Sequence, residues 1–298
     1  MKTAVILFAY NRPLHTRKVV EGLKRNDIKE LFVFCDGIKN ENHKEDVLKT
    51  RKIIDDINWC SVKKNYSVEN KGLAKSVIYG VTSVFNLGYE RVIVVEDDCI
   101  PKDDFIEYMN EAFDFYEDDE KVMHISGFGL PMKQKIQRST YLTPYPCSWG
   151  WGTWKKYWMS CNFEDTDEYE KLLKDEKEIK KFNYSGSAFS DFLDRQLNGK
   201  VNSWLIRWYF HIYKNDGVCV WKTKSDITND GFDGTGVHKV KFDRFNQKED
   251  EFELVYEFEE SIIPKNNIIK EFKRYFIDKS FSERLKTVIY MYTGIIVG

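Results

Sequence analysis

The chain has 298 residues, of which 42% are hydrophobic and 32% charged, a composition typical of a folded protein with a sizeable core. Its 46 basic and 48 acidic residues leave a net charge of −2, which argues against a general nucleic-acid-binding protein. The six cysteines form no CxxC pair, so the usual spacing of a zinc site is absent. Without a signal peptide or an apolar run of membrane-spanning length, the sequence predicts a cytoplasmic protein with free thiols.

The first hundred residues alternate between short apolar runs and amphipathic helical patterns. We expect strands at residues 3–8, 31–34, 61–66 and 91–95, and helices at about 13–24, at 44–58 and through 77–85. Continuous β-branched strands separated by helices are typical of a parallel sheet that is covered on both faces. The predicted fold class is therefore α/β, with a Rossmann-like, mostly parallel central sheet.

The second part of the chain has a looser pattern. We expect a strand at 122–125, a Trp- and Gly-rich stretch at 145–158, helices at 165–181, 189–197 and 203–213, and a strand at 218–221 before a glycine-rich loop at 230–238. No repeat or low-complexity linker divides the chain. One catalytic domain over 1–264, with halves at 1–101 and 102–264, and a helical tail at 265–298 are therefore predicted.

Three adjacent carboxylates, Glu96-Asp97-Asp98, directly follow the strongest predicted strand. Ligands bind at the carboxyl edge of such sheets, where Asn11-Arg12 and Asp36 are also expected. Neighbouring carboxylates repel one another and would also repel a diphosphate, so a compact site favours a bridging cation. Oxygen ligands suit Mg²⁺ or Mn²⁺, which commonly bind one or two carboxylates plus phosphates. The alternative is that these residues only cap the next helix.

Four motifs follow the predicted strands: Phe8-Ala9-Tyr10-Asn11-Arg12-Pro13, Cys35-Asp36-Gly37, Asn70-Lys71-Gly72-Leu73-Ala74 and Val94-Val95-Glu96-Asp97-Asp98. Together they resemble the nucleotide-sugar-binding half of GT-A glycosyltransferases, of the family 2-type bacterial enzymes and the N-acetylglucosaminyltransferase I group. The resemblance covers residues 1–101 and continues more faintly to 230–238. It implies a GT-A fold and a metal-dependent hexosyl- or N-acetylhexosaminyltransferase. The donor that it implies is a nucleotide-diphosphate sugar, with UDP favoured over dTDP or GDP as the nucleotide. The acceptor that it implies is a glycan or lipid-linked glycan in bacterial surface polysaccharide synthesis.

The resemblance also assigns roles to individual residues. The nucleotide-sugar would be held by Ala9, Tyr10, Asn11, Arg12, Asp36, Lys71, Gly72, Glu96 and Asp97. A Mn²⁺ or Mg²⁺ ion would be bound by Asp98, the likeliest direct ligand in the family's DxD-type motif. GT-A enzymes often add a histidine from the C-terminal side, so His238 is a candidate second ligand, although a lone histidine is more often structural.

The acceptor side offers two hypotheses. Trp149, Trp151 and Trp204 form a candidate wall for the sugar or acceptor, with core packing as the competing interpretation. An inverting transferase needs a base for the acceptor hydroxyl, and Asp194 and Asp191 share one helix face at a spacing of three. The family's usual base position falls at 204–206, where no acid occurs. Either one of these aspartates acts from a different place, or the reaction retains configuration; we favour inversion with Asp194.

The tail combines an apolar helical stripe from Ile269 to Tyr292 with an excess of basic residues over 265–286. Such a helix is able to lie on an anionic membrane, on the inner face of the plasma membrane, or to pack against the protein itself. Two other functions stay open. A sugar nucleotidyltransferase also places carboxylates and Mg²⁺ at a parallel sheet, and an inactive GT-A-like module would bind carbohydrate without turnover.

Overall fold

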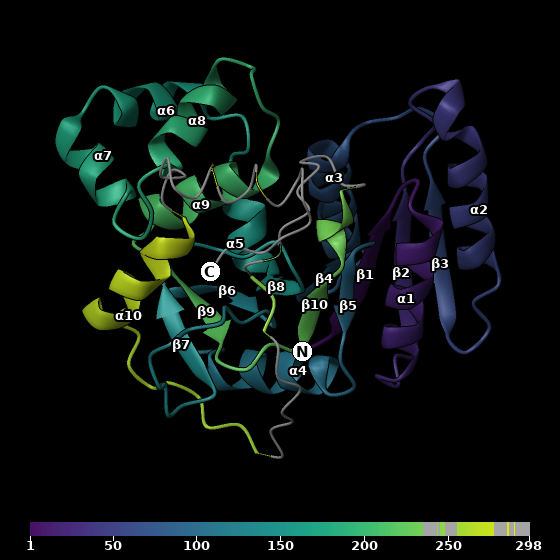
Figure 1. Cartoon of the computed structure of the whole chain (residues 1–298), viewed down its shortest axis with the longest axis horizontal. Coiled ribbons are helices and arrows are strands. Elements are labelled where there is room, and N and C mark those ends of the chain that lie inside the picture. Colours follow the sequence, from purple (N-terminus) through teal and green to yellow (C-terminus); the bar gives the residue numbers. More distant parts are fainter. Residues whose placement is uncertain (235–242, 244, 248–254, 277–284, 286–288, 290–298) are drawn as a thin grey trace.

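The computed structural model describes residues 1–234, 243, 245–247, 255–276, 285 and 289. Their core is an eight-stranded sheet with strand order β3-β2-β1-β4-β8-β6-β9-β7 (Figure 1). Six of these strands share one direction, and only β8 and β7 run against their neighbours. Helices cover both faces, with α1, α2 and α4 on one side and α3, α5 and α9 on the other. The predicted α/β class and its mostly parallel sheet are confirmed.

The first half of the sheet is wholly parallel. It comprises β1 (Thr3–Ala9), α1 (Pro13–Lys24), β2 (Glu30–Cys35), α2 (Lys44–Asp55), β3 (Ser61–Tyr66), α3 (Leu73–Asn86) and β4 (Arg91–Glu96). Every residue of β4 before Glu96 is buried, as expected for a central strand between two helical layers. Pro13 occupies the first turn of α1, where its missing N–H costs no hydrogen bond. The sequence predicted all of these elements to within a few residues.

The second half mixes strand directions. It contains β5 (Cys99–Pro101), α4 (Phe105–Phe115), β6 (Val122–Ser126), β7 (Thr140–Thr143), β8 (Trp151–Trp154), α5 (Lys155–Ser160), α6 (Thr166–Leu173), α7 (Glu176–Phe182), α8 (Phe189–Leu197), α9 (Trp204–Lys214), β9 (Val218–Lys222), β10 (Ile227–Asn229) and α10 (Asn266–Phe272), with short 3₁₀ turns at Glu41–His43, Gly231–Asp233 and Lys273–Tyr275. The single helix predicted at 165–181 is two helices. The first ends at Leu173, and Asp175 caps the start of the second, accepting from the amides of Lys177 and Glu178.

The described start of the tail packs into the domain. Ile268, Ile269 and Phe272 are buried, and the Phe272 ring lies 5.0 Å from that of Trp221 on β9. Of the two interpretations of the tail, packing against the protein itself therefore holds for these three apolar side chains, which cover the core. The stripe beyond Phe276 lies almost wholly outside the described residues. In the part of the chain that the structure describes, no helix has the length and apolarity needed to cross a bilayer.

His124 on β6 is fully buried, and its ring stacks on Trp151 with the centroids 5.4 Å apart. Both ring nitrogens face N–H groups: Nδ1 lies 3.2 Å from Trp208 Nε1, and Nε2 lies 3.2 Å from the backbone nitrogen of Cys147. Burial lowers the pKa of His124 to about 3, because an imidazolium in the core loses its hydration. The neutral ring therefore belongs to the packing between β6, β8 and α9.

We expect acidification to destabilise the protein through His124. A histidine in the unfolded chain gains a proton near pH 6.5, whereas folded His124 stays neutral down to about pH 3. The unfolded state binds more protons across this window, so stability falls as the pH falls, by about 2 kcal/mol between pH 6.5 and 5. Urea unfolding at about pH 7 and 5 measures the effect. Wild type should lose more stability than His124→Gln, and equal losses would contradict this account.

Candidate functional site

The ends of the parallel strands gather the predicted polar residues at one edge of the sheet. Tyr10 follows β1, Asp36 follows β2, and Glu96 ends β4, with β1 paired to both neighbours. The antiparallel strand β8 begins at the same edge, since Trp151 pairs with Val94. The loop that carries Trp149 therefore also reaches this edge, as expected for a site at the carboxyl ends of the strands.

Among the described residues, Arg12 is the cation nearest to the acidic triplet. Its Nη1 lies 2.7 Å from Asp98 Oδ2 and 3.7 Å from Asp97 Oδ1. The backbone amide of Tyr10 donates to Asp97 Oδ2 at 3.1 Å. Residues that follow β1 thus hold the two aspartates that follow β4, because β1 and β4 are adjacent in the sheet. The structure brings together four residues that the sequence grouped by motif alone.

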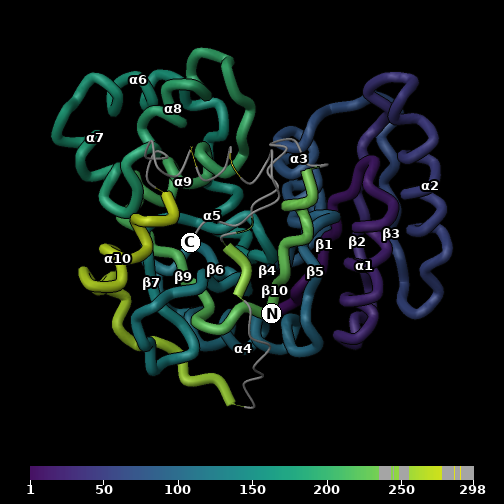
Figure 2. Tube along the Cα trace, viewed as in Figure 1, coloured from purple at the N-terminus to yellow at the C-terminus, as the bar shows by residue number. Residues whose placement is uncertain are grey.

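A second acidic segment joins the triplet through a short ribbon. Strand β10 pairs antiparallel with β5, and the amide of Asp230 donates to the Asp98 carbonyl at 2.8 Å (Figure 2). This places Asp230 and Asp233 beside α1. His15 Nε2 lies 3.1 Å from Asp233 Oδ2, and Lys18 Nζ lies 2.6 Å from Asp230 Oδ2. We name the seven residues of this site the carboxylate cluster: Arg12, His15, Lys18, Asp97, Asp98, Asp230 and Asp233.

His15 and Lys18 were not predicted from the sequence. In the 230–238 loop, the glycines and His238 were considered, but Asp230 and Asp233 were not. A signal was present, because Arg12, His15 and Lys18 are spaced by three residues at the start of α1 and so share one helix face. The acidic partners were not deducible, since they depend on the pairing of two three-residue strands. His238, the second proposed metal ligand, lies outside the described residues.

The acidic triplet is short of positive charge. Burial and the two neighbouring aspartates raise the pKa of Glu96 well above its usual range, and Arg12 only partly opposes this. Burial and Asp98 raise the pKa of Asp97 to about 7, against the opposing effects of Arg12 and the Tyr10 amide. Glu96 Oε1 is buried and accepts no hydrogen bond from the described residues. Three carboxylates here are therefore not ionised together at neutral pH unless a further cation approaches.

The donor set fits a hard divalent cation held jointly with phosphate. Carboxylate oxygens are the ligands that Mg²⁺ and Mn²⁺ prefer, usually one or two together with substrate phosphates. Across the described ranges, no three His, Cys, Asp or Glu side chains form a complete protein site for a metal ion. The described carboxylates therefore suit a divalent cation that also binds phosphate.

Asp36 organises the neighbouring loops. Its carboxylate accepts hydrogen bonds from the backbone amides of Gly37, Lys71 and Gly72 at 2.8–2.9 Å. Tyr10 reaches the same region, with its hydroxyl 2.7 Å from His43 Nδ1. A small hollow beside them is lined by Cys35, Asp36, Lys71 and Tyr79, among others. Of the residues predicted to bind a nucleotide, Asp36 and Lys71 line this hollow.

A cavity of about 650 Å³ lies elsewhere on the described protein. It is lined by Lys2, Glu30, Leu87 and Tyr89, which stand near the amino ends of the strands, and by the outer face of β2 and β3. Those residues form no part of the carboxylate cluster. The candidate site is identified by the charged residues that it brings together, and not by the size of a cavity.

The three tryptophans proposed as a sugar wall have different environments. Trp151 is 0% and Trp204 3% exposed, and their rings stack on each other with centroids 4.6 Å apart. As packed here, neither ring offers a face to a sugar, so this part of the interpretation is corrected to core packing. Trp149 is half-buried at the carboxyl edge, with its ring 5.9 Å from that of Phe232, which is next to Asp233. Trp149 therefore borders the carboxylate cluster.

Asp191 and Asp194 lie on α8, outside the carboxylate cluster. The end of α8 is held to the start of α9, because Gln196 accepts from the Ser203 amide at 2.7 Å. The start of α9 in turn stacks on Trp151, at the amino end of β8, which lies at the carboxyl edge of the parallel strands. Asp194 accepts a hydrogen bond from Asn198 at 3.0 Å. Neither aspartate forms a hydrogen bond or an ion pair with a residue of the carboxylate cluster.

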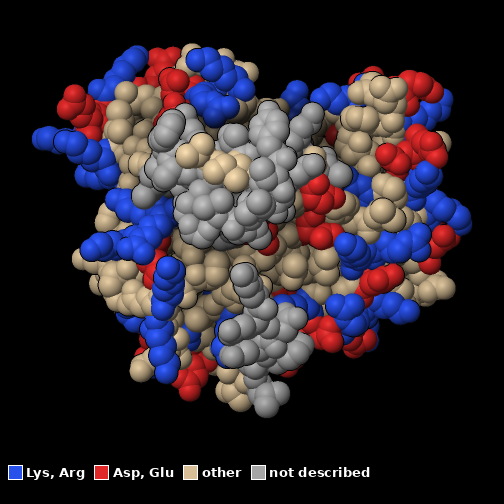
Figure 3. Space-filling model, viewed as in Figure 1, with Lys and Arg blue, Asp and Glu red and all other residues tan. Residues whose placement is uncertain are grey.

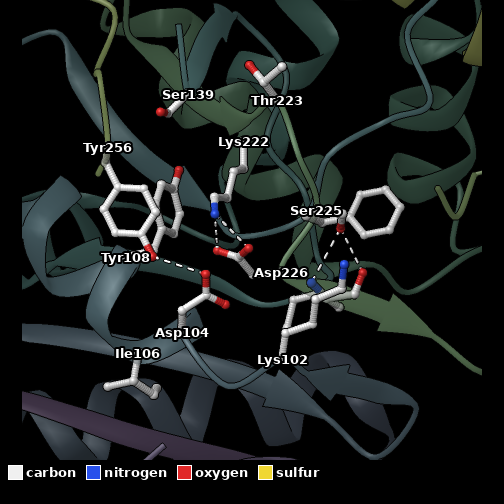
Figure 4. A network of polar contacts seen from close by, with 12 residues as sticks. Lys102, Asp104, Ile106, Tyr108, Ser139, Lys222, Thr223, Ser225, Asp226 and Tyr256 are labelled. Carbon is white, nitrogen blue, oxygen red and sulfur yellow. Dashed lines mark hydrogen bonds and ion pairs between the residues drawn. The ribbon is translucent and has the colours of Figure 1, made fainter. Parts of the chain in front are cut away.

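A buried ion pair anchors the segment that carries Asp230. Lys222 Nζ lies 2.6 Å from the Asp226 carboxylate, and the rings of Tyr108 and Tyr256 stand 4.6 and 4.7 Å from the ammonium (Figure 4). The Asp226 backbone accepts from the Lys102 amide and donates to the Gly127 carbonyl, both at 2.8 Å. Asp226 immediately precedes β10, so this anchor fixes the ribbon that brings Asp230 to Asp98.

Comparison with known proteins gives fold-level similarity only. No protein-family profile and no curated protein sequence matches the chain. Among solved structures, the mannosyltransferase PcManGT from Pyrobaculum calidifontis, in complex with GDP-Man and Mn²⁺, is 13% identical over 52% of this chain and 45% of its own, with a TM-score of 0.37. TarS of S. aureus is 14% identical over 76% and 59%, with a TM-score of 0.41. A cytidylyltransferase from Leptospira borgpetersenii is 13% identical over 54% and 66%, with a TM-score of 0.33.

The chain thus spans about half the length of the first two of these structures. At TM-scores below 0.5 they carry no argument about activity. The function has to be argued from the carboxylate cluster itself.

Proposed function

We propose that the protein is a GT-A-type, metal-dependent glycosyltransferase that moves a sugar from a nucleotide-diphosphate sugar, UDP-linked by preference, to a glycan or lipid-linked glycan. The observation that supports it is the acidic triplet at the end of β4, where Asp97 and Glu96 have raised pKa values and Arg12 lies 2.7 Å from Asp98. The proposed setting is bacterial surface polysaccharide synthesis at the cytoplasmic face of the plasma membrane. The sugar transferred would be a hexosyl or N-acetylhexosaminyl group.

The described residues divide the work as follows. Ala9, Tyr10, Asn11, Asp36, Lys71 and Gly72 would hold the nucleoside. The Asp36 carboxylate accepts hydrogen bonds from the backbone amides of Lys71 and Gly72 beside the carboxyl ends of β1 and β2. Asp98, with Asp97, would hold Mn²⁺ or Mg²⁺, and His238 remains a proposed further ligand. When bound, the cation would neutralise the departing diphosphate. Arg12 lies at hydrogen-bond distance from Asp98 and would turn toward the phosphates as donor. Trp149 would flank the sugar.

Gly231 tests the proposed metal site without removing a charge. A Cβ added at Gly231 would lie 2.5 Å from Asp98 Oδ2 and 2.9 Å from Asn229 Oδ1. Gly231→Ala must therefore displace the carboxylate, and we expect Mn²⁺-dependent nucleotide affinity to fall about tenfold. Calorimetric titration measures the affinity, and a thermal melt checks the fold. If the folded variant keeps the affinity of the wild type, the position of the Asp98 carboxylate next to Gly231 does not matter for nucleotide binding.

The catalytic base is proposed as Asp194, with Asp191 as the second candidate. A base that takes the acceptor proton contributes about 100- to 10,000-fold to the rate. We expect Asp194→Asn to lower kcat by such a factor while donor affinity stays unchanged, because α8 does not contact the carboxylate cluster. Asp191→Asn, three residues away on the same helix face, is the matched comparison. If neither substitution lowers kcat, the base lies elsewhere, and Asp233, half-exposed beside His15, is next to test.

Product analysis separates this proposal from its rivals. The protein is incubated with a panel of nucleotide-sugars, Mn²⁺ and short glycan acceptors, and the released phosphates are identified. A transferase releases nucleoside diphosphate and extends the acceptor. Release of pyrophosphate from a nucleoside triphosphate and sugar phosphate would assign a nucleotidyltransferase instead. Glycan binding without any turnover would support the alternative that the protein is an inactive carbohydrate-binding module.

A further inference from the structure

Five cationic side chains from two distant segments gather on one corner of the molecule. Lys270, Lys273 and Arg274 belong to α10 and the turn after it, and Lys133 and Lys135 to the loop before β7. The Glu271 carboxylate joins the two segments, accepting from the backbone amides of Lys133 at 2.5 Å and Gln134 at 3.0 Å. We name these five residues the basic face.

The basic face is not balanced by acids. Among the described residues, none of its five cations has a carboxylate within ion-pair distance, whereas the neighbouring Arg138 and Lys265 pair with Glu257 and Glu259. The one acid between them, Glu271, is occupied by backbone amides. Figure 3 shows Lys and Arg side chains concentrated over this corner. In a chain with a net charge of only −2, such a local excess creates a positive potential.

The basic face is not accompanied by an exposed apolar side of α10. The apolar side of α10 is buried against β9, so only its charged side is available for contact. Attachment through α10 would therefore be electrostatic and would weaken with salt. The sequence that continues beyond Phe276 ends in an uncharged, largely apolar stretch, Thr287–Gly298. A basic region followed by an apolar one fits a bilayer with anionic head groups better than a soluble polyanion.

We infer that the basic face docks the protein on an anionic lipid surface. Each Lys or Arg near such a surface contributes about 1 kcal/mol, so a few residues suffice for reversible binding. The inference does not depend on the proposed transferase activity, because it concerns a corner that contains no residue of the carboxylate cluster.

Vesicle co-sedimentation tests the inference with the full chain. The vesicles are phosphatidylcholine alone, or phosphatidylcholine with about 30% phosphatidylglycerol. We expect binding only to the anionic vesicles at about 0.1 M salt, and release at about 1 M. The triple variant Lys135→Ala, Lys270→Ala, Arg274→Ala should bind about 100-fold more weakly, which corresponds to about fivefold per residue. A thermal melt confirms that these exposed substitutions leave the fold intact.

The matched control removes three exposed lysines elsewhere, as Lys24→Ala, Lys75→Ala, Lys200→Ala, with the same change in net charge. It should retain the affinity of the wild type for anionic vesicles. An equal loss in both triple variants would overturn the inference, because net charge alone would then govern binding. Absence of binding to anionic vesicles would also overturn it. So would binding to dextran sulfate without binding to vesicles, which would assign the basic face to an anionic glycan.

Discussion

Asp98→Asn is expected to lower kcat/KM for the nucleotide-sugar at least about 1,000-fold. The substitution keeps the size of the side chain but removes the charge that would bind the divalent cation. Stabilisation of a leaving diphosphate by such a cation contributes several kcal/mol, and each 1.36 kcal/mol corresponds to a factor of ten. Steady-state kinetics with saturating Mn²⁺ measures the effect, and a thermal melt verifies folding.

Asp103→Asn provides the matched control for Asp98→Asn. Asp103 follows the same ribbon strand, β5, but is exposed and paired with Arg25, so its substitution should change the rate less than twofold. A folded Asp98→Asn protein with wild-type turnover would contradict the role of Asp98. A fall of equal size in Asp103→Asn would mean that the loss is not specific to the carboxylate cluster.

Lys222→Met is expected to cost about 3–5 kcal/mol of stability, the largest effect of a single substitution that the structure indicates. Asp226 is 3% exposed, so removal of the ammonium leaves a carboxylate in the core without its ion-pair partner. The methionine preserves most of the side-chain volume against Tyr108 and Tyr256, which limits the contribution from packing. Urea unfolding near pH 8 measures the loss.

The double variant Lys222→Met, Asp226→Leu should recover at least about 2 kcal/mol of that loss, because apolar pairs often replace buried ion pairs at little cost. The penalty of Lys222→Met should also depend on pH. Burial raises the pKa of Asp226 to about 7 even beside Lys222, and loss of the ammonium raises it further. At about pH 5 the carboxyl is protonated in the folded variant, so the loss should be smaller there than at about pH 8. A double variant less stable than Lys222→Met would contradict the interpretation of these residues as a pair.

Much of the fold and one side of the carboxylate cluster were predictable from the sequence. The β-branched run before Glu96 identifies a buried central strand, and parallel strands place their carboxyl ends at one edge. The closeness of Arg12 to Asp98 follows from that rule, because β1 and β4 are neighbours in the sheet. Local sequence and a general rule of sheet geometry were enough for this part.

The remaining parts depend on long-range packing. Asp230 reaches Asp98 only through the pairing of β10 with β5, strands too short to give a sequence pattern. Trp151 and Trp204 stack inside the molecule because Trp151 on β8 faces α9, a contact between distant segments that the glycines around Trp151 do not reveal. The apolar stripe of α10 is compatible with both a membrane and the core. The contact of Phe272 with Trp221 decides for the core.

The most direct test of the proposed function is thermal stability measured with each nucleotide and nucleotide-sugar, with and without Mn²⁺, for wild type and Asp98→Asn. A donor present at about 100 times its dissociation constant stabilises the folded state by about 2.7 kcal/mol. The proposal predicts a shift with one nucleotide class that requires Mn²⁺ and is lost in Asp98→Asn. Absence of a shift with every nucleotide, in protein that is folded and able to bind Mn²⁺, would contradict the assignment as a nucleotide-sugar transferase.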